Sequence, residues 1–274
     1  MNRKPLLDNK NLKEIMTREI LYPLWDSGLK VGHASREVKE ALTESQKDIR
    51  NKNSMLDARY VCGDRKIAKS FINKFLKFCR KNQPAQYLNE LLQHQVERRS
   101  GKGNTVFLQA PDVKNGVGGL RDYQGILWMA KVKFNLEDLS GLIDKKYLTE
   151  QEAKSFEEAY SFLLRVRNEL HFRSTRPVDT LHLEKQPEIA QGLGYPQEDI
   201  FRRVEAFMGD YYTKAQSIHQ ICGILEERLV HANSGNTSKL SFRNVLNAYR
   251  SPPIQKVDKF DLIEDTLISP DPNI

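Results

Sequence analysis

The stretch DVKNGVGGLRDYQGILWMAKVKF, Asp112–Phe134, decides how the chain is interpreted. It begins as a basic loop with three glycines and continues as a segment whose apolar residues recur every three or four positions. That spacing predicts an amphipathic helix beginning at Leu120. Backbone N–H groups at the start of a helix attract anions, and glycines let a phosphate approach the backbone closely. The stretch therefore predicts either a phosphate-binding loop or a tight turn that only starts a helix.

The loop supplies the candidate phosphate-binding residues of the chain. These are Lys114, Gly116, Gly118, Gly119 and Arg121. The two cations add positive charge, but nothing here matches a P-loop, so a glycine-rich loop alone is weak evidence. The alternative is structural: Gly118 and Gly119 permit a tight turn, and Asp122 lies in the first helical turn, where the helix dipole favours a carboxylate.

Apolar residues at helical spacing recur outside this stretch as well. Further helices are expected over Leu12–Leu24, from Val38 to about Ile49, over Arg65–Lys81, from Pro84 to about Arg99, after Thr149 to about Phe172, after Pro187 to Gly192 or Gly194, and from about Asp199 to His231. Asp64 can cap the helix that starts at Arg65, and Thr149 with Glu152 forms a capping box. Several long helices with one-sided apolar stripes predict a helical bundle.

Extended segments are few. LKVGHAS, Leu29–Ser35, predicts a short strand, and FDLIEDTLISPDPNI, Phe260–Ile274, predicts two short strands around Glu264-Asp265. NSGNTSK, Asn233–Lys239, has the composition of a linker. The fold class expected from these elements is α+β and predominantly α-helical.

Composition narrows the class of protein. The 274 residues are 29% charged and 39% hydrophobic, typical of a soluble globular protein with one large or two modest domains. A net charge of +7 suits an anionic partner, but no stretch interleaves aromatic and basic residues, so nucleic acid is not the expected one. No apolar run approaches the roughly 20 residues that cross a bilayer, no secretory signal is visible, and the three cysteines lack metal-ligand spacing. We therefore expect a cytoplasmic protein with free thiols and no membrane partner.

VKNGVGGLRDYQGILWMAK, within the quoted stretch, resembles the signature of the GlnD family, bifunctional uridylyltransferase/uridylyl-removing enzymes acting on the signal protein PII. The related glutamine-synthetase adenylyltransferases carry a similar segment. LYPLWDSGLKVGHASRE and MLDARYVCGD resemble the second half of that family's nucleotidyltransferase domain. LTEQEAKSFEEAYSFLLRVRNELHF, QPEIAQGLGY and FMGDYYTKA resemble the helical domain that follows. The resemblance covers about Leu21 to Leu229, with the motifs in order.

The resemblance implies three segments. Residues 1–82 correspond to the second half of a polymerase-β-like nucleotidyltransferase domain, residues 83–232 to the helical domain, and residues 233–274 to a linker and the start of a following segment. The implied fold is a partial nucleotidyltransferase half packed on a helical bundle. The implied activity is transfer of UMP from UTP to a tyrosine of a PII-like regulatory protein in nitrogen signalling, with Mg²⁺. The loop Lys114–Asp122 would face the transferase cleft, where Lys114 and Arg121 would contact phosphates or fix the two domains against each other.

The chain departs from the family pattern at the metal site. The family's chemistry uses two carboxylates, spaced Asp-x-Asp on a strand, to hold Mg²⁺. No Asp-x-Asp occurs in these 274 residues, and Gly32-His33 stands where the adenylyltransferases carry a further carboxylate. The HD phosphohydrolase and ACT domains of complete family members are also missing. The chain is therefore interpreted as a fragment without the catalytic strand, expected to be inactive alone.

A second polar site is considered at His33, Arg36, Asn168 and His171. His33 beside Arg36 could touch phosphate or a metal, although a lone histidine on a half-buried strand is more often structural. Arg165 and His171 match the Arg-x5-His spacing of HEPN ribonucleases, in which a histidine and an arginine act on phosphate without metal. The structural alternative is a polar layer packed against the nucleotidyltransferase half.

Two further expectations remain. Asp57 and Arg59 are expected to form an internal ion pair rather than a catalytic site.

A third function class is a non-catalytic module that binds a nucleotide or a protein, since such binding needs no Asp-x-Asp pair.

Overall fold

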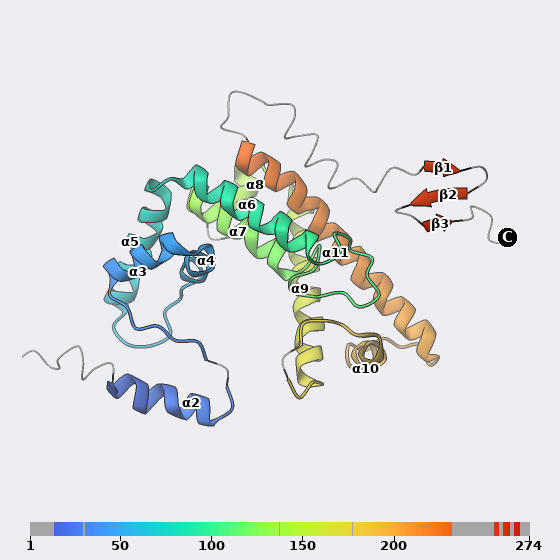
Figure 1. The fold of residues 1–274 in the computed structure, drawn as a ribbon, viewed down its shortest axis with the longest axis horizontal. Coiled ribbons are helices and arrows are strands. Elements are labelled where there is room, and N and C mark those ends of the chain that lie inside the picture. Colours follow the sequence, from blue (N-terminus) through green and yellow to red (C-terminus); the bar gives the residue numbers. More distant parts are fainter. Residues whose placement is uncertain are drawn as a thin grey trace, which may run out of the picture. The chain divides into compact units, whose positions relative to one another are not determined.

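The computed structural model describes residues 14–29, 31–136, 138–176 and 178–231, together with three strands near the C-terminus (Figure 1). The chain divides into two compact units, residues 1–55 and residues 56–274. The predicted linker Asn233–Lys239 and the pair Glu264-Asp265 lie outside the described residues.

Helices fill most of the first unit. The turn η1 (Thr17–Leu21) has π geometry and continues into α2 (Tyr22–Asp26). The helix predicted from Val38 to Ile49 is divided into α3 (Val38–Lys47) and α4 (Ile49–Leu56). The division falls at Asp48, whose extended backbone ends α3 and whose carboxylate accepts a hydrogen bond from the N–H of Arg50 at 2.8 Å.

The strand predicted over Leu29–Ser35 is wrong. Leu29 and residues 31–37 have no regular secondary structure, and the side chains of residues 32–37 are exposed. A strand persists only where a neighbouring backbone completes its hydrogen bonds. Among the described residues, no strand pairs with this segment.

The strands that the structure describes pair with one another. They are β1 (Gln255–Val257), β2 (Phe260–Ile263) and β3 (Thr266–Ile268), in an antiparallel sheet of order β1-β2-β3. In the register, Ile263 is opposite Thr266. The two strands predicted around Glu264-Asp265 are thus confirmed.

The predicted helices of the second unit occur in the expected order, together with two short elements, at residues 140–144 and 183–185, that were not predicted. They are α5 (Arg65–Lys81), α6 (Pro84–Ser100), α7 (Leu120–Phe134), α8 (Ser140–Asp144), α9 (Glu150–Phe172), the 3₁₀ turn η2 (Leu183–Lys185), α10 (Gln186–Gly192) and α11 (Ile200–His231). The predominantly helical fold is confirmed. None of the helices in the described part of the chain combines the length and apolar character that a membrane span requires.

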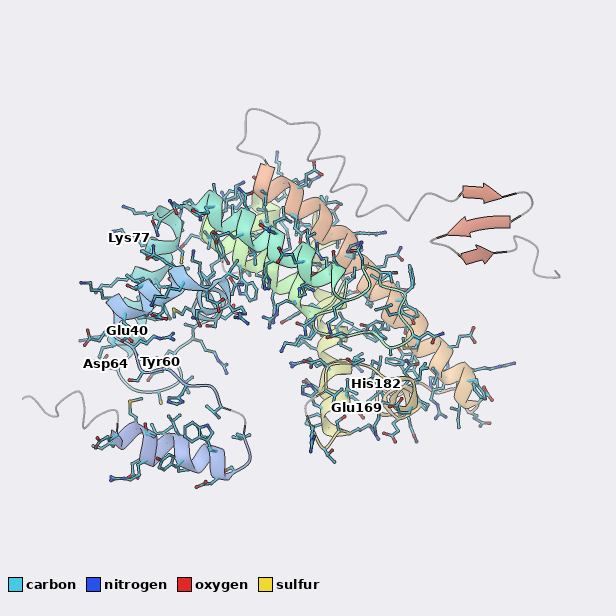
Figure 2. The ribbon with its side chains drawn as sticks, viewed as in Figure 1. Glu40, Tyr60, Asp64, Lys77, Glu169 and His182 are labelled. Carbon is cyan, nitrogen blue, oxygen red and sulfur yellow. The ribbon has the colours of Figure 1, made fainter. Side chains whose placement is uncertain are left out.

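Local signals explain where these helices begin. Asp64, in the connection that also carries Tyr60 (Figure 2), accepts a hydrogen bond from the N–H of Lys66 at 2.7 Å and caps α5. Pro84 occupies the first turn of α6. Thr149 and Glu152 exchange the two hydrogen bonds of a capping box at α9. Asp64, Thr149 and Glu152 provide acceptors for backbone N–H groups that a helix start leaves without partners, whereas Pro84 has no N–H that would need one.

The core lies where α11 packs against α7 and α9. Side chains with no exposed surface come from all three helices: Ile126, Met129, Phe156, Leu163, Ile218 and Leu225. Each large apolar side chain that leaves water stabilises the fold by about 1.5–3 kcal/mol. The loop that connects α6 to α7 runs beside this core (Figure 1), and it contacts α11 and the segment that follows α9.

Candidate functional site

The backbone of the predicted phosphate loop folds back on the start of α7. The carboxylate of Asp112 accepts hydrogen bonds from the N–H groups of Lys114 and Asn115 at 3.1 and 2.7 Å. The N–H of Leu120 donates to the carbonyl of Val113 at 3.0 Å, and the N–H of Arg121 donates to that of Lys114 at 2.9 Å. These first helical N–H groups are therefore occupied by the loop itself. Any anion here would be bound by side chains.

The three predicted glycines are required by close packing. Gly118 has φ +69°, and a Cβ there would overlap the carbonyl oxygen of Ala215 on α11. A Cβ at Gly116 would lie 2.5 Å from the carbonyl oxygen of Asp112, and one at Gly119 would lie 2.9 Å from that of Gly116. Glycine is the residue that tolerates both positive φ and such close approach. Their presence is thus explained without a ligand.

Asp122, expected only to favour the helix dipole, is the centre of a buried ionic network. Its carboxylate accepts hydrogen bonds from Arg98, from the Nε of Arg99 at 3.0 Å and from the N–H of Gly118 at 2.8 Å. Arg99 also donates to both carboxylate oxygens of Glu226, at 3.0 and 2.6 Å. Asp122, Arg99 and Glu226 are all buried. The network therefore joins α6, α7 and α11 behind the loop.

The network holds Asp122 ionised. Burial alone would raise the pKa of Asp122, but the charges of Arg99 and Arg98 and the hydrogen bonds from Arg98 and Gly118 outweigh it, so the pKa lies below its ordinary value. A buried charge is tolerated when it is paired and hydrogen-bonded in this way.

Arg121 lies on the other side of the loop, half-buried over the ring of Trp128, with 5.5 Å between its Cζ and the ring centroid. No carboxylate among the described residues lies within ion-pair distance of its guanidinium. Burial lowers the pKa of Arg121, and the neighbouring Arg98 lowers it further. A partly desolvated cation that lacks an ion-pair partner among the described residues favours an anion.

Lys114 belongs to a second group of charges around Asp179. Its Nζ lies 3.7 Å from one carboxylate oxygen of Asp179. The other oxygen accepts from the Nε of Arg167 at 2.7 Å and lies 3.0 Å from the Nε2 of His171. Burial acts to raise the pKa of Asp179, but the hydrogen bonds from Arg167 and His171 and the charge of Lys114 hold it below its ordinary value.

The other predicted polar residues fall into two pairs, one in each unit. His33 and Arg36 belong to the first unit, where both are exposed and the ring of His33 lies 5.3 Å from that of Trp25. Asn168 is exposed on α9, one turn from the half-buried His171. The half-buried strand expected to carry His33 is absent, because the segment has no pairing partner among the described residues.

The ion pair expected between Asp57 and Arg59 is wrong. Asp57 instead accepts a hydrogen bond from the indole Nε1 of Trp128 at 2.9 Å. A charged acceptor satisfies the buried indole donor, which would otherwise lose a hydrogen bond to water. Asp57 thereby fixes the ring on which Arg121 rests.

Sequence reasoning missed several residues of this region: Gln95, Arg98, Arg99, Arg167, Asp179 and Glu226. One signal could have identified part of the network. Gln95 and Arg99 continue the helical spacing of the buried Leu88 and Leu91, so polar residues occupy the core-facing stripe of α6. Their partners lie far away in sequence and carry no local signal.

The described residues do not fit a magnesium site. They contain no group of three or more His, Cys, Asp or Glu that could hold a metal ion. The carboxylates in and around the loop are each engaged by cations or donors: Asp112 by Lys102 and two loop N–H groups, Asp122 by two arginines, Asp57 by Trp128 and Asp179 by Arg167. Binding of an anion in this region would therefore depend on side-chain cations.

Comparison with known proteins places this region within a matched segment. A family model described as GlnD PII-uridylyltransferase matches residues 86–226. A relative named "Bifunctional uridylyltransferase/uridylyl-removing enzyme" in Bradyrhizobium sp. (strain BTAi1) is 34% identical to this chain, over 79% of this chain and 23% of the relative. A relative of the same name in Rhodospirillum rubrum is 33% identical, over 79% of this chain and 24% of the relative. A relative of the same name in Nitrobacter winogradskyi is 31% identical over 93% of this chain and 27% of its own length. The chain thus spans about a quarter of the length of these relatives. No solved structure matches.

Proposed function

The chain belongs to the GlnD PII-uridylyltransferase family, and from this membership we propose that it forms part of an enzyme that transfers UMP from UTP to a PII-like regulatory protein. Residues 1–82 would be the second half of the nucleotidyltransferase domain. Residues 83–232 would be the helical domain, which is consistent with the family match over residues 86–226. The HEPN ribonuclease and the stand-alone binding module are not favoured by this family assignment.

The observation that carries the proposal is the environment of the Arg121 guanidinium. Its guanidinium is half-buried, rests on Trp128 and lacks a carboxylate partner among the described residues. The loop that carries it also presents Lys114, which is about one-third exposed. In UMP transfer, the tyrosine oxygen attacks the α-phosphorus, the bond to the β-phosphate oxygen breaks, and pyrophosphate leaves as the hydroxyl proton is lost. Cations placed along the phosphates stabilise the charge that moves onto the leaving group.

Lys114 and Arg121 would therefore bind the phosphates of UTP through side-chain hydrogen bonds. Arginine donates bidentate hydrogen bonds to phosphate, whereas lysine acts as a point charge. Gly116, Gly118 and Gly119 would contribute by shaping the loop. Mg²⁺, when bound by the complete enzyme, would supply further neutralisation of the phosphates. Among the described residues, no group of three or more His, Cys, Asp or Glu could hold it.

The test is calorimetric titration of the chain with UTP and with ATP, with and without Mg²⁺. We expect UTP to bind and Arg121→Ala to weaken binding about tenfold, because one charge-assisted contact is lost. Arg165→Ala is the matched control, since Arg165 is an exposed arginine of α9 outside the site. Arg121→Ala could instead lower the unfolding midpoint and leave the affinity unchanged. In that case Arg121 would have a structural role only, and the phosphate site would be rejected.

A further inference from the structure

The surroundings of Asp179 contain more positive than negative charge. Arg167 and His171 are one turn apart on α9, so both reach the same carboxylate, at 2.7 and 3.0 Å. Lys114 approaches Asp179 from the α6–α7 loop at 3.7 Å. Arg121 is linked to Lys114 through the backbone, because its N–H donates to the carbonyl of Lys114 at 2.9 Å. Two segments distant in sequence thus direct three basic side chains, Lys114, Arg167 and His171, at one acceptor.

Asp179 is held in place by its backbone. Its carbonyl accepts a hydrogen bond from the N–H of Val113 at 2.8 Å, and the next residue, Thr180, forms an isolated β-bridge with Asp112. The backbone of Asp179 is therefore fixed beside the loop independently of its side-chain partners. Solvent reaches the cluster: the side chains of Lys114, Arg167, His171 and Asp179 are 31%, 27%, 27% and 24% exposed.

We propose that Arg167 and His171 extend the Lys114–Arg121 site into a polyphosphate-binding face, and that Asp179 is an internal counter-ion which the incoming polyphosphate displaces. This inference rests on the proposed function and adds residues of α9 to its site. A triphosphate carries several negative charges and accepts bidentate hydrogen bonds from a guanidinium, whereas Asp179 carries one charge and accepts from Arg167 through Nε alone. Displacement frees Arg167 and Lys114 for the phosphates.

If Asp179 is a counter-ion, removing its charge should raise the affinity for polyphosphate. Asp179→Asn removes the competing charge but keeps the side-chain volume, so it should tighten polyphosphate binding several-fold. Arg167→Gln removes a donor and a charge, so it should weaken binding about tenfold. A purely structural role for the Arg167–Asp179 pair predicts that both variants lose stability and that neither gains affinity.

The experiment is calorimetric titration of the full chain with inorganic tripolyphosphate, UTP and UMP. The panel is wild type, Arg121→Ala, Arg167→Gln, Arg167→Lys, Asp179→Asn and the control Arg165→Gln. We expect Arg167→Gln to weaken tripolyphosphate and UTP in parallel, Arg167→Lys to weaken them less, Asp179→Asn to tighten both, and the control to match wild type. UMP, with one phosphate, should bind weakly to every variant. Circular dichroism checks that each variant is folded, and Arg167→Lys with Asp179→Asn carries the test if Arg167→Gln does not fold.

Three results would overturn the proposal in different ways. If Arg121→Ala loses binding while Arg167→Gln matches the Arg165→Gln control, the site ends at the loop and the proposed function stands. If Asp179→Asn weakens binding, Asp179 is a ligand or a scaffold and not a counter-ion. If wild type binds neither tripolyphosphate nor UTP, the phosphate site of the proposed function fails together with its extension.

Discussion

At the scale of single residues, Asp122 shows how one carboxylate makes a loop rigid. It pairs with two arginines of α6 and accepts the N–H of Gly118, and these contacts are shielded from water. Removing one member of a buried ionic group leaves the others without compensation, which typically costs about 3–5 kcal/mol. The carboxylate therefore matters less as a complement to the helix dipole than as the partner of Arg98 and Arg99.

Asp122→Asn is expected to lower the free energy of unfolding by about 3–5 kcal/mol at neutral pH, because Arg98 and Arg99 lose their shared counter-ion. The folded-state pKa lies below the ordinary 3.8, so the carboxylate stabilises the fold above that pH and loses its contribution as the pH falls through the folded-state pKa. The difference between wild type and variant should therefore shrink in strong acid. Urea unfolding followed by circular dichroism at pH 7 and in acid measures it.

The control for this substitution is Asp144→Asn, at an exposed carboxylate at the end of α8. It should change the unfolding curve little at either pH. A small effect of Asp122→Asn at neutral pH would mean that water reaches the network and that Asp122 is not held as the geometry indicates.

At the scale of elements, the connection between α6 and α7 is shaped by the helix behind it. Gly118 has φ +69°, and its Cα faces the backbone of Ala215. Gly118→Ala should therefore destabilise the protein by about 3 kcal/mol or more, because positive φ and steric overlap add. Gly209→Ala, on the exposed face of the same α11 with open space around the added methyl, should instead stabilise it by about 0.5–1 kcal/mol. Denaturant unfolding of both variants measures the contrast, and equal stabilities would contradict the close approach.

The elements predicted well from sequence are those with local signals. Asp64, Pro84 and the pair Thr149 and Glu152 place the starts of α5, α6 and α9 at the expected residues. Such signals act within one helical turn, so they can be recognised in a short window. The strand at Leu29–Ser35 failed because alternation of apolar and polar residues does not specify a pairing partner.

The candidate site was predictable in part for the same reason. Lys114 and Arg121 are adjacent to a visible helix start, whereas Asp179 meets them through tertiary contacts. Arg99 and Glu226 are 127 positions apart, and no window of sequence joins them. The glycines were identified as special, but the sequence could not separate close packing on α11 from approach to a phosphate.

At the scale of the whole molecule, stability should be distributed unevenly along the chain. Side chains of α7, α9 and α11 include many with no exposed surface, and their backbone hydrogen bonds lie within long helices. Residues 32–37 are exposed and lie outside any helix or strand. Local opening is governed by this difference in buried contacts and protected hydrogen bonds.

Hydrogen–deuterium exchange followed by mass spectrometry should therefore divide the chain sharply. Peptides from the middle of α7, α9 and α11 should exchange only on the timescale of global unfolding, because breaking their hydrogen bonds requires opening the shared core. Peptides covering residues 31–37 should exchange within the earliest time point. Slow exchange there would show that the segment does have a pairing partner, and the strand predicted over Leu29–Ser35 would be reinstated.

If saturating UTP slows exchange at residues 112–123 and at Arg167–His171 but leaves residues 31–37 fast, the nucleotide acts on the loop and α9 together, as a site that uses both elements requires.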